Sequence, residues 1–312
     1  MENKNQTWGS YFIINGITDL PSVQAPIFVL VLLIYLSILF GNTTILTLIF
    51  SDTKLHTPMY FFLGNLSFLD ICYTTVTMHK ILLTYTSGDK TVSFAGCLTQ
   101  MYFYVAFLCS EYILLAAMAY DRYAAVCHPL RYQNLMSLER CSRLAMMSWG
   151  FGLLESIIFL GLISQYSFCR SNVINHLFCD LKPLIKLTCS NTNDIELVIQ
   201  ISAVVFGVFP LVFILVSYIL IVSAILRIRS KEGKRKAFST CSSHLTVVIL
   251  FFGIILSMYM RPKSAYSIEQ DKVLAILYAL CIPTLNPFIY SLRNKEVKNA
   301  LWKLKGSILG DK

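Results

Sequence analysis

Seven long apolar segments constrain the fold of this chain more than any other feature. They run approximately over residues 26–50, 58–85, 94–126, 139–163, 195–228, 236–260 and 270–292. A helix needs roughly 20 residues to cross about 30 Å of hydrocarbon, so each segment is long enough to span a bilayer. Because lipid satisfies no backbone hydrogen bonds, segments of this length must be helical. The sequence therefore predicts an all-α membrane protein, a bundle of seven transmembrane helices.

The composition supports a membrane protein and argues against other classes. Of the 312 residues, 56% are hydrophobic and 14% are charged, against roughly 25% charged in a soluble domain. The net charge of +9 arises from basic residues in short connectors, so we expect membrane lipid as a partner and no nucleic acid. No apolar core precedes Ile27, so we expect no cleaved signal peptide.

The connectors also predict the orientation of the chain in the membrane. With the amino terminus outside, 17 of the 26 Lys and Arg residues lie on the opposite side, which should be the cytoplasm. We therefore predict a multi-pass plasma-membrane protein with an extracellular tail (1–25), a transmembrane domain (26–292) and a cytoplasmic helix and tail (293–312). Asn5 begins an Asn-Gln-Thr glycosylation triplet in the expected extracellular tail.

A charged pair ends the third apolar segment, within the stretch from Met118 to Tyr132. Asp121 and Arg122 lie side by side there. One interpretation is that Arg122 only anchors the helix end at the membrane interface. The interpretation we favour is a switch, in which Asp121 holds Arg122 in one state and releases it to a partner in another.

Three acids lie inside the predicted membrane segments, namely Asp70, Glu111 and Glu155. A carboxylate at this depth costs at least about 3 kcal/mol, so each acid should face the bundle and find a partner. Asp70 and Glu111, with Asn286 nearby, predict a polar site that either binds a monovalent cation or shares a proton. For Glu155, an interhelical hydrogen bond and a role in a ligand cavity both stay open.

The cysteines divide by their predicted side of the membrane. Four of the 10 fall on the extracellular side, where disulfides form, and four cysteines allow three pairings. They are Cys97, Cys169, Cys179 and Cys189. The others lie in helices or on the cytoplasmic side, and we expect them to be free thiols.

Several stretches of the sequence together resemble the odorant receptor branch of the rhodopsin-like G-protein-coupled receptors. They are Leu55–Leu63 (LHTPMYFFL), Met118–Tyr132 (MAYDRYAAVCHPLRY), Ser217-Tyr218, Lys236–Leu245 (KAFSTCSSHL) and Pro283–Asn294 (PTLNPFIYSLRN). They follow the order of the family over nearly the whole chain. The resemblance implies a receptor that binds a volatile ligand outside and activates a stimulatory olfactory G protein inside, which raises cyclic AMP.

The resemblance also implies roles for individual residues. A G-protein switch is implied at Asp121, Arg122, Tyr123, Tyr218 and Tyr290. A sodium ion that modulates the inactive state, and is not a catalytic metal, is implied at Asp70, Glu111 and Asn286. Two disulfides are implied, Cys97–Cys179 and Cys169–Cys189. No catalytic residue and no other cofactor is expected.

Helical spacing groups a candidate ligand-binding set on the third, fifth and sixth segments, at positions that match ligand contacts of the family. The set is Tyr104, Val105, Leu108, Cys109, Tyr112, Ser202, Phe206, Phe252, Leu256 and Tyr259. The alternative is that these stripes only pack the bundle. Receptors for charged amines in this superfamily carry an aspartate where Tyr104 stands. We therefore expect a small, neutral, mostly apolar ligand, oriented by a hydrogen bond to Tyr259 or Ser202.

Two further features qualify the resemblance. The sixth segment lacks the tryptophan and proline of the wider family, and Phe252 stands where odorant receptors usually have tyrosine. After the seventh segment, Val297, Leu301 and Leu304 recur at helical spacing between lysines, which predicts a short amphipathic helix on the membrane surface. This helix has no cysteine, so we expect no palmitoyl anchor.

Other functions fit the sequence less well. An intramembrane enzyme would need a nucleophile with a base or a histidine cluster, but His79 and His244 fall near opposite membrane faces. A transporter or channel would often show internal repeats and broken helices, which we do not find. A receptor of the same fold that senses a metabolite outside the nose shares every feature above, so that alternative stays open.

Overall fold

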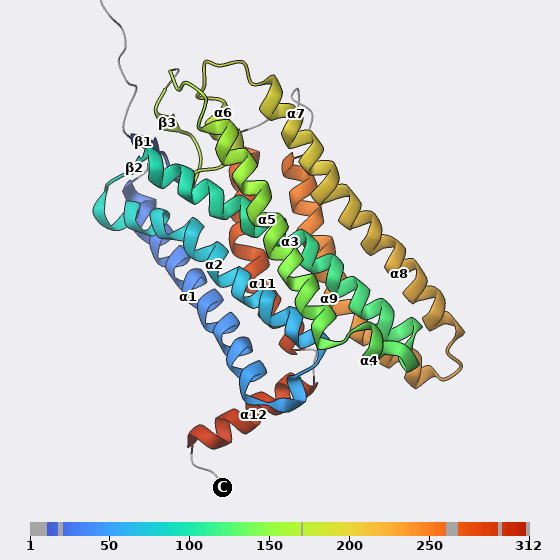
Figure 1. Ribbon diagram of the computed structural model, residues 1–312. Coiled ribbons are helices and arrows are strands. Elements are labelled where there is room, and N and C mark those ends of the chain that lie inside the picture. Colours follow the sequence, from blue (N-terminus) through green and yellow to red (C-terminus); the bar gives the residue numbers. More distant parts are fainter. Residues whose placement is uncertain (1–10, 18–20, 170, 260–267, 293–294, 310–312) are drawn as a thin grey trace, which may run out of the picture.

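The computed structural model describes residues 11–17, 21–169, 171–259, 268–292 and 295–309. Long helices lie side by side, with a small sheet over one end and a last helix across the other (Figure 1). We call the end that carries both disulfides the disulfide end, and the opposite end the Arg122 end. Within the described residues the prediction of an all-α bundle of seven membrane helices is confirmed.

The bundle consists of the following helices. They are α1 (Pro21–Ser51), α2 (Pro58–Ser87), α3 (Phe94–Cys127), α5 (Leu138–Ile163), α7 (Asn193–Ser202) continuing into α8 (Phe209–Arg227), α9 (Lys231–Tyr259), and α10 (Ile268–Ile276) continuing into α11 (Ile282–Leu292). The π-helical turn η3 (Ala203–Val208) joins α7 to α8, and the π-helical turn η5 (Leu277–Cys281) joins α10 to α11. The connectors hold η1 (Thr53–Leu55), η2 (Pro129–Arg131), α4 (Tyr132–Leu135) and α6 (Leu181–Ile185), and α12 (Lys295–Leu309) follows the bundle.

Some helices differ from their predicted extents. α1 begins at Pro21, before residue 26, because proline fits the first turn of a helix, where no backbone donor is needed. α9 begins at Lys231 and so takes up part of the expected basic connector. Among the described residues six helical stretches are apolar enough to cross a membrane by composition, and α2 is not one of them. Polar residues such as Asp70 and Lys80 lower its hydropathy, yet it packs against α1 and α3.

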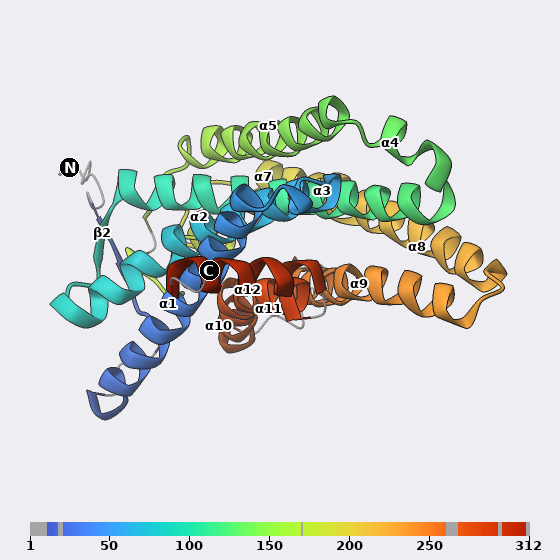
Figure 2. The ribbon, with the colours of Figure 1, turned by 90° about the horizontal axis from the view of Figure 1, so that it is seen from below.

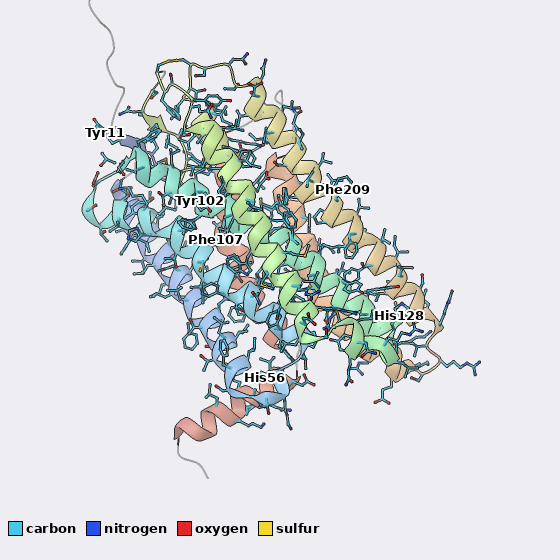
Figure 3. The ribbon with its side chains drawn as sticks, viewed as in Figure 1. Tyr11, His56, Tyr102, Phe107, His128 and Phe209 are labelled. Atoms are coloured by element: carbon cyan, nitrogen blue, oxygen red, sulfur yellow. A yellow bond between two sulfur atoms is a disulfide. The ribbon has the colours of Figure 1, made fainter. Side chains whose placement is uncertain are left out.

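The surface of the bundle is more apolar than parts of its interior. Phe209 on α8 is 62% exposed and points away from the helices (Figure 3), and Phe40 on α1 is 77% exposed. By contrast, Asn42, Asp70 and Asp121 are almost fully buried. This arrangement suits hydrocarbon outside the bundle, where apolar side chains cost nothing and charged ones are expensive.

A three-stranded sheet covers the disulfide end, which the sequence did not predict. β1 (Tyr11–Ile14) lies between β2 (Thr91–Ser93), to which it is antiparallel, and β3 (Val173–Ile174), to which it is parallel. Phe12 of β1 packs against Phe94 and Phe168, with ring centroids 5.9 and 5.4 Å away. Part of the expected amino-terminal tail therefore packs on the bundle.

α3 runs through the middle of the bundle and contacts α2, α5, α8 and α9 (Figure 2). At the Arg122 end, α12 lies beside α1 and η1, where Lys303 Nζ is 3.0 Å from Asp52 Oδ2. Val297 of α12 is buried, whereas Leu301 and Trp302 are exposed. The predicted amphipathic helix thus presents one apolar side to the bundle and another to its surroundings.

Candidate functional site

A mostly apolar cavity opens between α3, α5, α7, η3 and α9 in the half of the bundle near the disulfide end. About 620 Å³ of atom-free space lies within it and at its mouth, open solvent included. Its lining consists of Val105, Leu108, Cys109, Tyr112, Phe159, Asp180, Leu181, Ile199, Ser202, Ala203, Phe206, Gly207, Ile255 and Leu256. Concave, largely apolar sites with a few polar groups are typical of small-molecule binding.

Most of the predicted ligand-binding residues lie in this lining. They are Val105, Leu108, Cys109, Tyr112, Ser202, Phe206 and Leu256. The four from α3 share one face of that helix, and Leu256 faces them from α9. Ser202 and Phe206 come from the point where α7 passes into the π-helical turn η3.

Tyr104 and Phe252, also in the predicted set, do not line this cavity. Tyr104 is fully buried between Tyr73 and Phe178, with ring centroids 5.5 and 4.9 Å away. Phe252 packs against Tyr112 at 5.5 Å and is 2% exposed. Helical spacing gave the direction of each side chain but not the neighbours that cover it. The side chain of Tyr259 lies outside the described residues, as does Asn5.

The connector between α5 and α7 contributes lining residues that sequence reasoning missed. Asp180 and Leu181 follow Cys179 directly, and the disulfide from Cys179 to Cys97 on α3 brings them to the cavity. The Asp180 carboxyl is buried and accepts a hydrogen bond of 2.7 Å from the Leu181 amide. Burial raises the pKa of this carboxyl. Its place next to a predicted disulfide was the signal that could have identified it.

Two disulfides fix the connector at this end. Cys97 pairs with Cys179 and Cys169 with Cys189, at Cα–Cα distances of 5.4 and 5.8 Å. Gln100 of α3 reinforces the first, since its side-chain oxygen accepts a hydrogen bond of 2.8 Å from the Cys179 amide. The six cysteines elsewhere are free.

Close packing of α5 on α3 positions one wall of the cavity. Gly152 lies so near α3 that a Cβ atom there would collide with the Ala106 carbonyl oxygen and with Ser110. Further along α5, Ser156 donates a hydrogen bond of 2.6 Å to the Tyr102 carbonyl. Glu155 lies between these two residues in sequence and accepts a hydrogen bond from Ser202 of α7.

A polar cluster lies deeper in the bundle, where α2, α3 and α11 meet. Asn286 Nδ2 donates to Asp70 Oδ2 at 2.9 Å, and the Tyr278 hydroxyl donates to Glu111 Oε2 at 3.0 Å. Glu111 Oε1, Asn286 Oδ1 and Thr74 Oγ1 are buried, and none of the three has a hydrogen-bond partner among the described residues. Buried acceptors left unpaired are costly, so the donor set fits a small hard cation.

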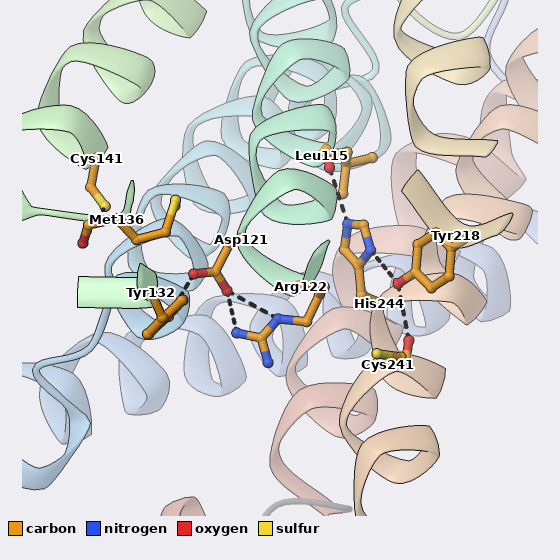
Figure 4. A network of polar contacts seen from close by, with 9 residues as sticks. All are labelled: Leu115, Asp121, Arg122, Tyr132, Met136, Cys141, Tyr218, Cys241 and His244. Atoms are coloured by element: carbon orange, nitrogen blue, oxygen red, sulfur yellow. Dashed lines mark hydrogen bonds and ion pairs between the residues drawn. The ribbon is translucent and has the colours of Figure 1, made fainter. Parts of the chain in front are cut away.

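At the Arg122 end, Asp121 binds two partners (Figure 4). Arg122 donates through Nε and Nη2 to Asp121 Oδ2, with the Nε contact at 3.0 Å. The Tyr132 hydroxyl donates to Asp121 Oδ1 at 2.7 Å. Burial, and then the neighbouring Asp121, raise the pKa of Tyr132, so this hydroxyl stays a donor. Tyr132 is a partner of the pair that the sequence analysis missed.

A second contact at this end joins three helices (Figure 4). His244 of α9 places Nε2 at 3.1 Å from the Leu115 carbonyl oxygen of α3. Its Nδ1 lies 2.8 Å from the hydroxyl of Tyr218 on α8, which also lies 3.1 Å from the Cys241 carbonyl oxygen. A carbonyl only accepts, so in the neutral ring Nε2 carries the proton and Nδ1 is an acceptor. The Tyr218 hydroxyl has one proton, which it can donate to Nδ1 or to the Cys241 carbonyl. We call Tyr218, His244 and the Leu115 carbonyl the helix latch.

The other two predicted switch residues lie apart from these contacts. The Tyr123 hydroxyl pairs with His128 Nε2 at 3.0 Å. Tyr290 of α11 is 2% exposed, and within the described part of the chain its hydroxyl has no hydrogen-bond partner. In this arrangement Tyr290 is therefore buried but unengaged.

Comparison with known proteins gives matches along nearly the whole chain. A family model described as olfactory receptor matches residues 31–306. The chain is 46% identical over 309 residues to human olfactory receptor 1L6, covering 99% of this chain and 89% of that protein. It is 47% identical over 302 residues to mouse olfactory receptor 5B21, covering 96% and 94% respectively.

Proposed function

The chain belongs to the olfactory receptor family, and we propose that it binds a small, neutral, mostly apolar odorant in the cavity between α3, α5, η3 and α9. Binding activates a stimulatory olfactory-type G protein and raises cyclic AMP. The observation that carries the ligand class is the lining, which is apolar apart from a few groups such as Ser202, Tyr112 and Asp180.

We propose that the disulfide end faces the extracellular side of the plasma membrane. Disulfides persist in oxidising compartments, which supports this orientation. Basic residues at the start of α9, among them Lys231, Lys234 and Arg235, then lie at the cytoplasmic face, as the positive-inside rule requires. An epitope placed before residue 11 should bind antibody on intact cells, and detection only after permeabilisation would reverse the topology.

In the proposed coupling, α9 carries the signal between the two ends. Leu256 at the cavity and His244 at the helix latch are 12 residues apart on this one helix, about 18 Å at 1.5 Å per residue. Movement of α9 away from α3 would open the latch and free Arg122 from Asp121 to meet the G protein. Tyr218 and Tyr290 would then stabilise the open arrangement.

We further propose that a sodium ion binds Asp70, Glu111 and Asn286 in the resting receptor. The unpaired Glu111 Oε1 and Asn286 Oδ1 support this, because a cation would satisfy both. The ion would favour the resting state and take no part in chemistry.

The experiment that tests the function is a cyclic AMP measurement in cells that express the receptor, with a panel of odorants and non-volatile metabolites. We expect neutral oxygenated odorants to give saturable responses. The Arg122→Ala receptor, at equal surface level, is the control for coupling. If only non-volatile metabolites activate the receptor, the alternative role outside olfaction replaces this one, and silence toward the whole panel refutes both.

A further inference from the structure

Glu155 stands directly behind the cavity without lining it. It lies on α5, is 6% exposed, and accepts a hydrogen bond from Ser202 Oγ. Among the described residues no Lys or Arg pairs with it. Ser202, by contrast, does line the cavity. The acid therefore reaches the ligand space only through the serine.

The local backbone explains why Ser202 turns to Glu155. A helical serine usually donates to the carbonyl four residues earlier, as Ser217 and Ser223 do with Phe213 and Ile219 at 2.9 Å. Ser202 is the last residue of α7, directly before the π-helical turn η3. π-helical turns alter the direction of side chains and occur often at functional sites.

The hydrogen-bond inventory then fixes what Ser202 can offer a ligand. A hydroxyl has one proton to donate and two lone pairs that accept. Here the Ser202 hydroxyl donates its proton in the hydrogen bond to Glu155, so only its lone pairs are left for a ligand. Glu155 Oε1 accepts whether it belongs to a carboxylate or is the carbonyl oxygen of a neutral acid. Donation to a carboxyl also polarises the hydroxyl and makes its oxygen a better acceptor.

We propose that Glu155 is a positioning residue that makes Ser202 a hydrogen-bond acceptor, so that the cavity selects odorants bearing a hydroxyl over the corresponding ketones. This inference rests on the proposed odorant site. A ketone would place its lone pairs against those of Ser202 and leave its oxygen unpaired there. The Tyr112 hydroxyl both donates and accepts, so it favours neither class.

The test compares pairs of probes with one carbon skeleton, namely cyclohexanol and cyclohexanone, menthol and menthone, and borneol and camphor. For pairs that activate the receptor, the alcohol should be about 2- to 12-fold more potent in the cyclic AMP assay, the value of one hydrogen bond. Ser202→Ala should bring the potency ratio close to one. Glu155→Leu should do the same, because it frees the serine proton for a ketone.

A double-mutant cycle separates positioning from direct contact. In the Ser202→Ala background, Glu155→Leu should leave the alcohol-to-ketone ratio unchanged, because its effect runs through the serine. Phe206→Leu, an apolar change in the same wall, is the matched control and should shift both probes while keeping the ratio.

Three results would overturn the inference. They are equal or greater potency of ketones in the unmodified receptor, a ratio that survives Ser202→Ala, and a change of ratio by Glu155→Leu in the Ser202→Ala background. Each leaves the proposed odorant function intact, because the receptor still responds. If no probe activates the unmodified receptor at normal surface level, the proposed ligand class itself is refuted and the inference with it.

Discussion

Replacing His244 by Phe should raise the basal activity of the receptor. Phenylalanine keeps an aromatic ring of similar size at this site, which is 1% exposed, so the packing of α9 is disturbed little. The change deletes both nitrogens of the helix latch, and with them the contacts to Tyr218 and to the Leu115 carbonyl. The resting arrangement loses these contacts, whereas an open arrangement with α9 displaced would not have made them.

The size of the effect follows from the two contacts. A net contribution of about 0.5 to 1.5 kcal/mol each gives about 1 to 3 kcal/mol. The lower half of this range applies, because the Tyr218 proton can turn to the Cys241 carbonyl at 3.1 Å. A loss of about 1.4 kcal/mol is a tenfold change in the equilibrium. If roughly 1% of receptors are active without ligand, the variant should show about 10%.

The measurement is cyclic AMP without odorant, normalised to receptor at the cell surface. His56→Phe is the matched control, since His56 is exposed in the connector near η1 and contacts the Ile49 carbonyl, away from the latch. It should leave basal activity unchanged. Basal activity of His244→Phe at or below that of the unmodified receptor, with normal surface level, would falsify the latch.

The remaining predictions concern coupling, the disulfide end and helix packing. Arg122→Ala should abolish the cyclic AMP response at normal surface expression, and a retained response contradicts its role in coupling. Cys97→Ser removes a crosslink worth about 2 to 4 kcal/mol, so we expect retention inside the cell, whereas Cys72→Ser, at a free thiol, should reach the surface. Gly152→Ala should lower the melting temperature of purified receptor, because overpacking costs about 1 to 3 kcal/mol. Gly150→Ala is the control and should leave the melting temperature unchanged, since open space surrounds Gly150. Equal effects of the two substitutions would rule out the close contact at Gly152.

The membrane helices could be predicted from the sequence because hydrocarbon imposes a minimum length and permits few alternatives. α3 and α5 begin and end within one residue of their predicted limits. Their first turns carry local signals too, since Ser93 and Ser137 each accept a hydrogen bond from a backbone amide of the helix that follows. α2 shows where composition fails to predict a membrane helix. Its polar residues can lie within the membrane only because neighbouring helices cover them.

The site was predictable only where side chains point along one helix face. Val105 and Leu108 lie where spacing put them, but Tyr104 is covered by Phe178, a residue of a connector whose path no periodicity describes. The same limit explains Asp180 and Tyr132. A connector carries each of these residues to its place. For Asp180, the Cys97–Cys179 disulfide holds the connector against α3.

The position of the contacts along α3 suggests why an odorant can act on the Arg122 end at all. Tyr112 lines the cavity, the Leu115 carbonyl belongs to the latch one turn later, and Asp121 follows about two turns beyond it. An odorant that bridges Tyr112 and Leu256 therefore acts on α3 and α9, two of the three helices that the latch joins. Because the latch is buried, breaking it halfway would leave polar groups unpaired, so closed and fully open arrangements are both favoured over intermediate ones. We thus expect odorants to change the fraction of open receptors and not the degree of opening.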